Sequence, residues 1–155
     1  MSTSELVEIR PAARDDVSAI LAIYTELESG ADLTASAEES WVNSAWNRMT
    51  ASDQHLLVAV LDDQVVGTVT LAMHPTLRHR GSTWAELENV VVSQEYRGRG
   101  VGGRLVRHAM EIAKSAGAYK IHLVSDLATS DAYPFYESLG FVHMGRGYKQ
   151  YIRKD

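Results

Sequence analysis

The stretch VVVSQEYRGRGVGGRLV, residues Val90–Val106, joins a run of valines to a helix-forming segment through four glycines and three arginines. The valines favour a buried strand, because β-branched side chains pack well on a pleated sheet. Gly98, Gly100, Gly102 and Gly103 allow the backbone to turn tightly and to approach a ligand closely. A strand, a glycine-rich turn and a helix in this order predict a β-α unit with a ligand at the turn.

The start of the predicted helix, near Gly100, leaves several backbone N–H groups without partners inside the helix. These groups and the helix dipole favour a bound phosphate. Arg97, Arg99 and Arg104 add positive charge, and a guanidinium pairs with two phosphate oxygens at once. We therefore expect the glycine-rich loop, defined as residues 97–103, to hold a diphosphate.

Two other interpretations of the loop stay open. Gly98-x-Gly100-x-x-Gly103 matches the dinucleotide-binding fingerprint, and Asp126 lies 23 positions past Gly103. That fingerprint usually opens a domain, whereas only 52 residues follow Gly103. The P-loop pattern is absent from the sequence. The loop could also be a plain turn beside a solvated basic helix face.

Length and composition predict one soluble domain over residues 1–155, with 45% hydrophobic and 23% charged residues. The net charge of −5 argues against nonspecific binding to nucleic acid or to an anionic membrane. The absence of cysteine excludes disulfides and thiolate metal sites, and the six histidines lack metal-ligand spacing, so we expect no metal. Without a signal-like or membrane-spanning run, we expect a cytoplasmic protein.

The hydrophobic periodicity predicts an α/β fold (an α+β mixed sheet), antiparallel early and with a β-α-β unit late, in the order β-α-α-β-β-β-α-β-α-β-β. Asp62-Asp63 is a hairpin-turn candidate, and the last two strands are expected to form a closing hairpin. The expected strands are 6–12, 55–61, 64–74, 83–93, 119–125, 141–145 and 148–153, and the expected helices are 14–27, 37–50, 100–116 and 131–140.

Two motifs resemble a known superfamily. Arg97-x-x-Gly100-x-Gly102 after an apolar strand resembles the acyl-CoA motif of the GNAT superfamily of N-acetyltransferases, and PFYESLGF (Pro134–Phe141) resembles the late helix of that superfamily. The similarity runs from Val7 to about Arg153 and implies the GNAT-like acyl-CoA N-acyltransferase fold. Both motifs have the spacing and order that the superfamily shows.

Within the superfamily, ELENVVVSQEYRGRGVG, AGAYKIHLVSD and GYKQYIRK are similar to glucosamine-6-phosphate N-acetyltransferases. Asn89 stands where those enzymes carry a second acidic residue, and the segment between Asp126 and Tyr136 is about three residues longer. Both departures lie in the part of the chain that the resemblance places next to the acceptor substrate. The acceptor therefore stays open among amino sugar phosphates, polyamines, amino acids, antibiotics and peptides.

The resemblance implies transfer of the acetyl group from acetyl-CoA to a primary amine of a small molecule, by direct attack in a ternary complex. The pantetheine arm would lie along the backbone as an added strand, and a backbone N–H near Val91 would polarise the carbonyl. A noncatalytic acyl-CoA-binding or sensor module on the same fold is the alternative. The residues implied in cofactor binding are Val90, Val91, Val92, Arg97, Gly98, Arg99, Gly100, Val101, Gly102 and Gly103.

The residues implied in the chemistry are a tyrosine and carboxylates. Tyr136 matches the family position of the acid that protonates the leaving thiolate. Glu86 and Glu88 alternate onto one face of their strand, and Glu88 matches the glutamate of the related enzymes, as base or substrate-positioning group. Asp126 ends the next strand and is expected to orient the acceptor. His122 is expected to be packed rather than catalytic.

The remaining aromatic residues are assigned structural roles. Tyr24, Trp41 and Trp46 lie at helical spacing and are expected in the core. Tyr148 and Tyr151 are placed in a homodimer interface by the resemblance, since related enzymes pair there.

Overall fold

The computed structural model describes residues 6–27, 39–125, 132–145 and 147–153. The chain forms two compact units, Met1–Leu123 and Val124–Asp155, and each is described by itself. Among the described residues, no helix is both long and apolar enough to cross a bilayer.

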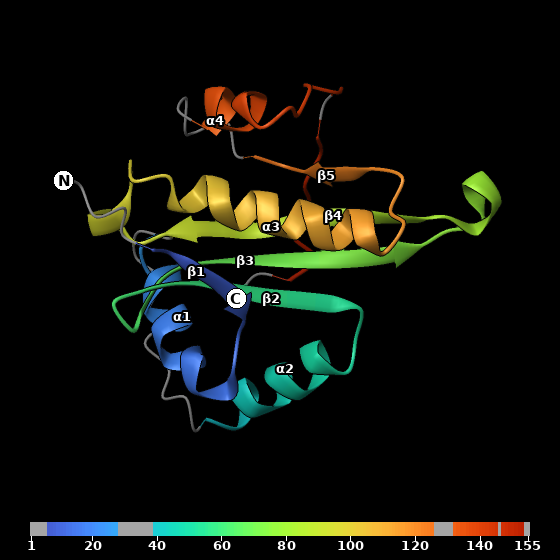
Figure 1. The fold of residues 1–155 in the computed structure, drawn as a ribbon. Coiled ribbons are helices and arrows are strands. Elements are labelled where there is room, and N and C mark those ends of the chain that lie inside the picture. Colours follow the sequence, from blue (N-terminus) through green and yellow to red (C-terminus); the bar gives the residue numbers. More distant parts are fainter. Residues whose placement is uncertain (1–5, 28–38, 126–131, 146, 154–155) are drawn as a thin grey trace. The chain divides into compact units, whose positions relative to one another are not determined.

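The first unit is built on a mixed sheet of five strands in the order β1-β2-β3-β4-β5 (Figure 1). Neighbouring strands from β1 to β4 run antiparallel, and β4 pairs with β5 in parallel, so the predicted mixed sheet is confirmed. Asp62 and Asp63 have φ of 50° and 60° and make the predicted two-residue hairpin turn. The strands are β1 Glu8–Pro11, β2 Gln54–Leu61, β3 Gln64–Pro75, β4 Thr83–Val92 and β5 Ile121–Leu123.

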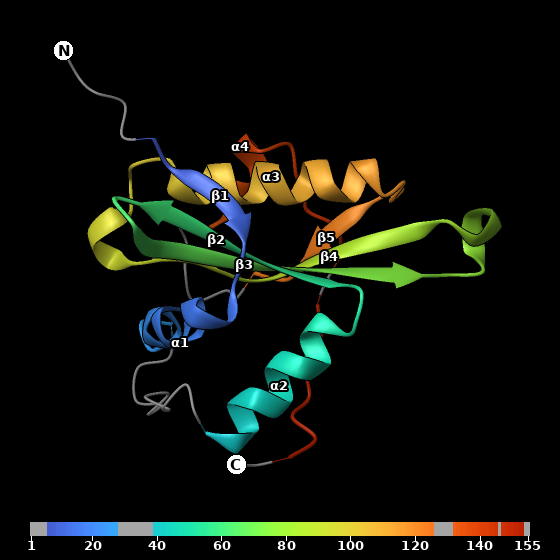
Figure 2. The same ribbon diagram turned by 60° about the horizontal axis from the view of Figure 1, so that its bottom comes forward.

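Helix α3 covers one face of this sheet, and α1 and α2 cover the other (Figures 1 and 2). The β3–β4 hairpin extends past the helices, and its tip is the short 3-10 helix η2 (Arg78–Gly81). The core lies between the layers, with Leu57, Val69, Leu71 and Leu105 at 0–1% exposure. The helices are α1 Val17–Tyr24, α2 Ser40–Thr50 and α3 Val101–Ser115.

Gly67 on β3 fixes how closely α3 approaches the sheet. A Cβ atom at this position would lie 3.0 Å from Cδ1 of Leu105 and 3.1 Å from the carbonyl oxygen of Val91. These distances are tighter than most Cβ contacts, so a side chain here would push Leu105 or the backbone of Val91 aside by a few tenths of an ångström, and glycine favours the close approach. The contact also shows that Gly67, and with it every second residue of β3, faces α3.

An ion pair ties β1 to the 3-10 helix η1 (Arg14–Asp16) that precedes α1. Arg10 donates hydrogen bonds of 2.6 and 3.0 Å to the two carboxylate oxygens of Asp16, and the amide of Ala13 donates a third of 2.6 Å. The hydrogen bonds from Arg10 lower the pKa of Asp16 against the opposing effect of burial. The carboxylate is largely shielded from solvent, with 11% of its side chain exposed.

The second unit contains helix α4 (Ala132–Ser138), which ends in a turn where Gly140 has a φ of 90°. The closing hairpin predicted for 141–145 and 148–153 is wrong for the described residues of this segment, which form no strand. Val142 and Tyr148 are 77% and 92% exposed. Residues with a strand preference form a strand only where a neighbouring strand or surface packs against them, and an isolated hairpin is marginal in water.

Candidate functional site

A β-bulge divides β4 into two halves. Thr70 pairs with Glu88 and Thr68 with Val91, so Asn89 and Val90 together oppose a single residue of β3. Asn89 has a φ of 52°, in the left-handed region that asparagine tolerates better than most side chains. A bulge bends its strand and interrupts the ladder. The sequence alone gave no signal for this bend beyond the asparagine itself.

The half of β4 after the bulge has an open edge. Pairing with β5 covers only Ala85–Leu87, and within the described part of the first unit no strand pairs with that edge beyond Leu87. The side chain of Val91 is buried, which holds this half of the strand against the core. The open edge can therefore receive an extended ligand as an added strand.

The glycine-rich loop follows the open edge and leads into α3. Gly98 and Gly100 have φ of 75° and 80°, and Gly100 is the N-cap residue of α3. No atom lies within 4 Å of a Cβ built on either glycine, so backbone conformation rather than crowding requires them. Five amides make no hydrogen bond within the described part of the chain: those of Gly98, Gly100, Val101, Gly102 and Gly103.

The arginines of the loop have structural contacts that the sequence did not predict. Nε of Arg97 donates a 2.9 Å hydrogen bond to the carbonyl of Val92, and its Nη2 lies 3.6 Å from Glu26. Glu26 also accepts hydrogen bonds from the Gln94 amide and the Ser93 hydroxyl. Arg97 therefore fixes the loop against the end of β4. Glu26 was missed because it lies about 70 residues away in sequence.

Glu86 and Glu88 lie on one face of β4, as predicted. Their register partners Ala72 and Thr70 lie on the face of β3 opposite to Gly67, so both carboxylates face away from α3. Tyr24 lies on this side as well, since α1 packs on β3 and β4 on the face opposite to α3.

Burial raises the pKa of Tyr24, and the negative charge of Glu88 adds to the rise, whereas the nearby hydroxyls of Thr70 and Thr68 oppose it. Oγ1 of Thr70 is buried and closes no hydrogen bond of good geometry with any described residue, although the Tyr24 hydroxyl is near it. Tyr24 is thus packed, as predicted, against polar groups of the sheet.

Two histidines from the flanking strands bracket Glu86. Nε2 of His74 on β3 lies 3.1 Å from Oε2 of Glu86, and Nε2 of His122 on β5 lies 3.4 Å from Oε1. The Trp84 ring stacks on His74 with a centroid distance of 4.2 Å and contacts His122 at 4.5 Å. Lys120 lies 5.3 Å above the same ring. The ring of His122 packs against Trp84, as expected, and 43% of its side chain stays exposed.

Tyr136 lies on α4 in the second unit, between two phenylalanines. Its ring makes edge-on contacts with Phe135 at 4.9 Å and Phe141 at 5.8 Å. Burial raises the pKa of Tyr136, so the phenol stays protonated at neutral pH. Asp126 lies outside the described residues. The roles predicted for both residues stay predictions.

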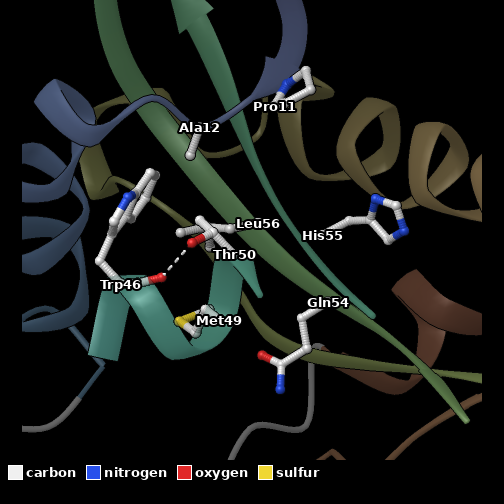
Figure 3. Close-up of a pocket in the computed structure, with 8 residues that line it drawn as sticks. All are labelled: Pro11, Ala12, Trp46, Met49, Thr50, Gln54, His55 and Leu56. Carbon is white, nitrogen blue, oxygen red and sulfur yellow. Dashed lines mark hydrogen bonds between the residues drawn. The ribbon is translucent and has the colours of Figure 1, made fainter. Parts of the chain in front are cut away.

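A pocket between α2 and the β1–β2 edge has a volume of about 200 Å³. Figure 3 shows Trp46 and Met49 of α2 facing Leu56 of β2 across it. None of the predicted catalytic or cofactor-binding residues lines this pocket. Trp46 forms one wall, and Trp41 is 49% exposed and donates to Glu39, so the core position predicted for Trp41 is wrong.

Comparison with known proteins identifies relatives across most of the chain. The model of the acetyltransferase (GNAT) family matches residues 18–141. A glucosamine 6-phosphate N-acetyltransferase of Trypanosoma brucei brucei is 36% identical over 92 residues, which are 59% of this chain and 58% of that protein. The aminoalkylphosphonate N-acetyltransferase of Salmonella typhimurium is 29% identical over 145 residues, 92% of this chain and 85% of the relative.

A solved structure of a putative acetyltransferase from Agrobacterium tumefaciens superposes with a TM-score of 0.86. It is 32% identical to this chain, and the match covers 95% of this chain and 99% of that one. These findings confirm the resemblance inferred from the motifs and the fold class.

Proposed function

Because the chain belongs to the acetyltransferase (GNAT) family, we propose that it transfers the acetyl group of acetyl-CoA to a primary amine of a small molecule. The observation that carries this proposal is the set of unbonded amides at the start of α3, directly after an open strand edge. The amides would bind the diphosphate, and the edge at Val90–Val92 would bind the pantetheine arm. The thioester would then lie near the bulge at Asn89.

The reaction is direct attack by the amine in a ternary complex. A C–N bond forms at the thioester carbon, the C–S bond breaks, and the thiolate takes a proton. A backbone N–H near Val91 would stabilise the developing oxyanion, and loss of such a donor costs about 10²–10³ in rate. Tyr136 would protonate the thiolate, since a phenol is in the acid form at neutral pH and burial raises its pKa further.

The acceptor amine would approach over the half of β4 before the bulge. Glu86 and Glu88 lie there on one face and favour a cationic amine, with Glu88 closer to the bulge. Asp126 would help to orient the acceptor. The relatives are named for glucosamine 6-phosphate and for aminoalkylphosphonates, so amines that carry a phosphate or phosphonate are the first acceptors to test.

Incubation with acetyl-CoA and a panel of amines, with detection of free thiol, tests the proposal. Tyr136→Phe should lower kcat by about 10²-fold, because a general acid contributes about 10²–10⁴-fold, and should leave acetyl-CoA affinity within about twofold. Tyr133→Phe on the same helix is the matched control and should keep kcat. Tight acetyl-CoA binding without turnover of any amine would instead support a noncatalytic acyl-CoA sensor.

We also propose a cytoplasmic homodimer. Tyr148 and Tyr151 are 92% and 76% exposed, which fits side chains that a second copy covers. Sedimentation equilibrium of the wild type and of a Tyr148→Ser, Tyr151→Ser double variant tests this, and a monomeric wild type contradicts it.

A further inference from the structure

The carboxylate of Glu86 is held between two imidazoles that come from different strands. His74 on β3 and His122 on β5 each direct Nε2 at a different oxygen of Glu86, at 3.1 and 3.4 Å. Trp84 fixes both rings by direct contact. Three adjacent strands thus contribute to one His–Glu–His cluster on the face of the sheet opposite to α3.

Stability does not explain this cluster well. The side chains of His74 and His122 are 38% and 43% exposed, and that of Glu86 is 27% exposed. Ion pairs exposed to this degree typically contribute little to stability, because water screens them. A rigid arrangement that contributes little stability and faces solvent is typical of groups held ready for a ligand.

The contacts determine which nitrogen of His122 can accept a proton. Nε2 of His122 lies 3.4 Å from Oε1 of Glu86, and the negative charge of this carboxylate favours the tautomer that carries its hydrogen on Nε2 and its lone pair on Nδ1. Within the described part of the chain, no group bonds to Nδ1 of His122. A carboxylate that orients an imidazole in this way is the arrangement by which histidine serves as a general base near neutral pH.

His122 on β5 also lies beside the part of β4 where the proposed reaction would take place. It is the register partner of Glu86, one position before the parallel pairing ends at Leu87 and Leu123. The open edge that would bind the pantetheine arm begins directly after that point. His74, in contrast, lies on the β3 side of β4, so of the two imidazoles His122 is closer to this edge. The cluster is flanked by Glu88 along β4 and by Lys120 above Trp84.

We infer, on the basis of the acetyl transfer proposed above, that His122 removes the proton of the acceptor ammonium and that Glu86 is its positioning residue. The ammonium gives one proton to Nδ1 of His122, directly or through one water. The neutral amine then forms the C–N bond, and the proton that its nitrogen still loses ends on the thiolate when the C–S bond breaks. The imidazolium, paired with Glu86, returns its proton to solvent.

The experiment measures kcat for His122→Ala on the full chain, with and without added imidazole, using an amine that the wild type acetylates. We expect kcat to fall by about 10²-fold and acetyl-CoA affinity to stay within about twofold. Added imidazole should raise the kcat of the variant by about tenfold. Glu86→Gln should lower kcat by about tenfold without rescue, because the base is still present but is misoriented. His108→Ala on α3 is the control and should keep kcat.

The outcomes separate the two proposals. If the wild type turns over and His122→Ala stays within threefold of it, or loses activity that imidazole does not restore, the inference is wrong and the proposed function stands. If the wild type acetylates no amine in the panel, both are wrong. If His122→Ala does not fold, His122→Gln keeps the bulk of the side chain, and its kcat decides in the same way.

Discussion

The two halves of β4 present different parts of the chain. After the bulge, Val90–Val92 and the glycine-rich loop offer backbone groups, namely an open edge and unbonded amides. Before the bulge, Trp84–Glu88 offers side chains that are completed by His74 and His122 from the neighbouring strands. In the function proposed above, the backbone groups would bind what all acyl-CoA molecules share, whereas the side chains would differ with the acceptor. The comparison predicts that variants in the two halves affect different kinetic constants.

Glu88→Gln should have the largest effect of the variants that follow, and the effect should be limited to the acceptor. The carboxylate faces the expected path of the amine, and a hydrogen bond to a charged group is worth about 1.5–3 kcal/mol. The KM for the amine should therefore rise by about 10- to 100-fold, while acetyl-CoA affinity stays within about twofold. Steady-state kinetics in the amine, with calorimetry for acetyl-CoA, measures both.

Glu111→Gln on α3 removes the same charge on the opposite face of the sheet and is the control for Glu88→Gln. Glu111→Gln should change neither the KM for the amine nor the affinity for acetyl-CoA. If Glu88→Gln weakens acetyl-CoA binding as strongly as amine binding, the two halves of β4 are not separate sites.

Gly100→Ala should weaken cofactor binding and leave the KM for the amine almost unchanged, which is the reverse of Glu88→Gln. The residue has a φ of 80° at the start of α3, and alanine there costs about 1–2 kcal/mol unless the backbone turns away. Turning the backbone would misdirect the amides of the loop, so affinity for coenzyme A should fall by about tenfold while the KM for the amine changes little. Calorimetric titration with coenzyme A measures the loss.

The end of the same helix provides a matched control for Gly100→Ala. Gly117 has a φ of 79° and, like Gly100, has no atom within 4 Å of an added Cβ. Gly117→Ala should therefore lower the free energy of unfolding by a similar amount and leave coenzyme A affinity unchanged. Equal losses of affinity in both variants would show that general destabilisation, and not the loop, is responsible.

The sequence predicted the strand, the glycine-rich turn and the helix of this region because they are continuous in the chain, and the ligand expected there stays a prediction. Strand, glycines and helix start follow one another within Val90–Val106, and the conformation that glycine permits is a local property. The cluster before the bulge could not be predicted in this way. His74, Glu86 and His122 are 12 and 36 positions apart, and only the register of β3, β4 and β5 brings them together.

The predictions of a core position for Trp41 and of a closing hairpin near the C-terminus are wrong for a related reason. Trp41 has helical spacing to its neighbours, yet periodicity does not show how much of a short helix the sheet covers, and this ring is half-exposed. The segments 141–145 and 148–153 were predicted to form a closing hairpin, but a strand needs an edge with which to pair. In both regions the local sequence pattern does not show which surface, if any, the segment packs against.

The smallest effect is expected at a position that belongs to neither half of β4. Asp16→Asn removes the carboxylate that Arg10 and the Ala13 amide bind, so the free energy of unfolding should fall by about 1–2 kcal/mol at pH 7 while kcat and both affinities of the folded protein stay unchanged. Because Arg10 lowers the pKa of Asp16 in the folded state, the stabilisation is complete above the pKa of the unfolded carboxyl, about 3.9, and is lost as the pH falls through the lower folded value. Urea unfolding of wild type and variant at pH 7 and pH 3 measures the difference, which should shrink at the lower pH. A difference that is the same at both values would mean that packing rather than the charge of Asp16 stabilises the junction of β1 and α1.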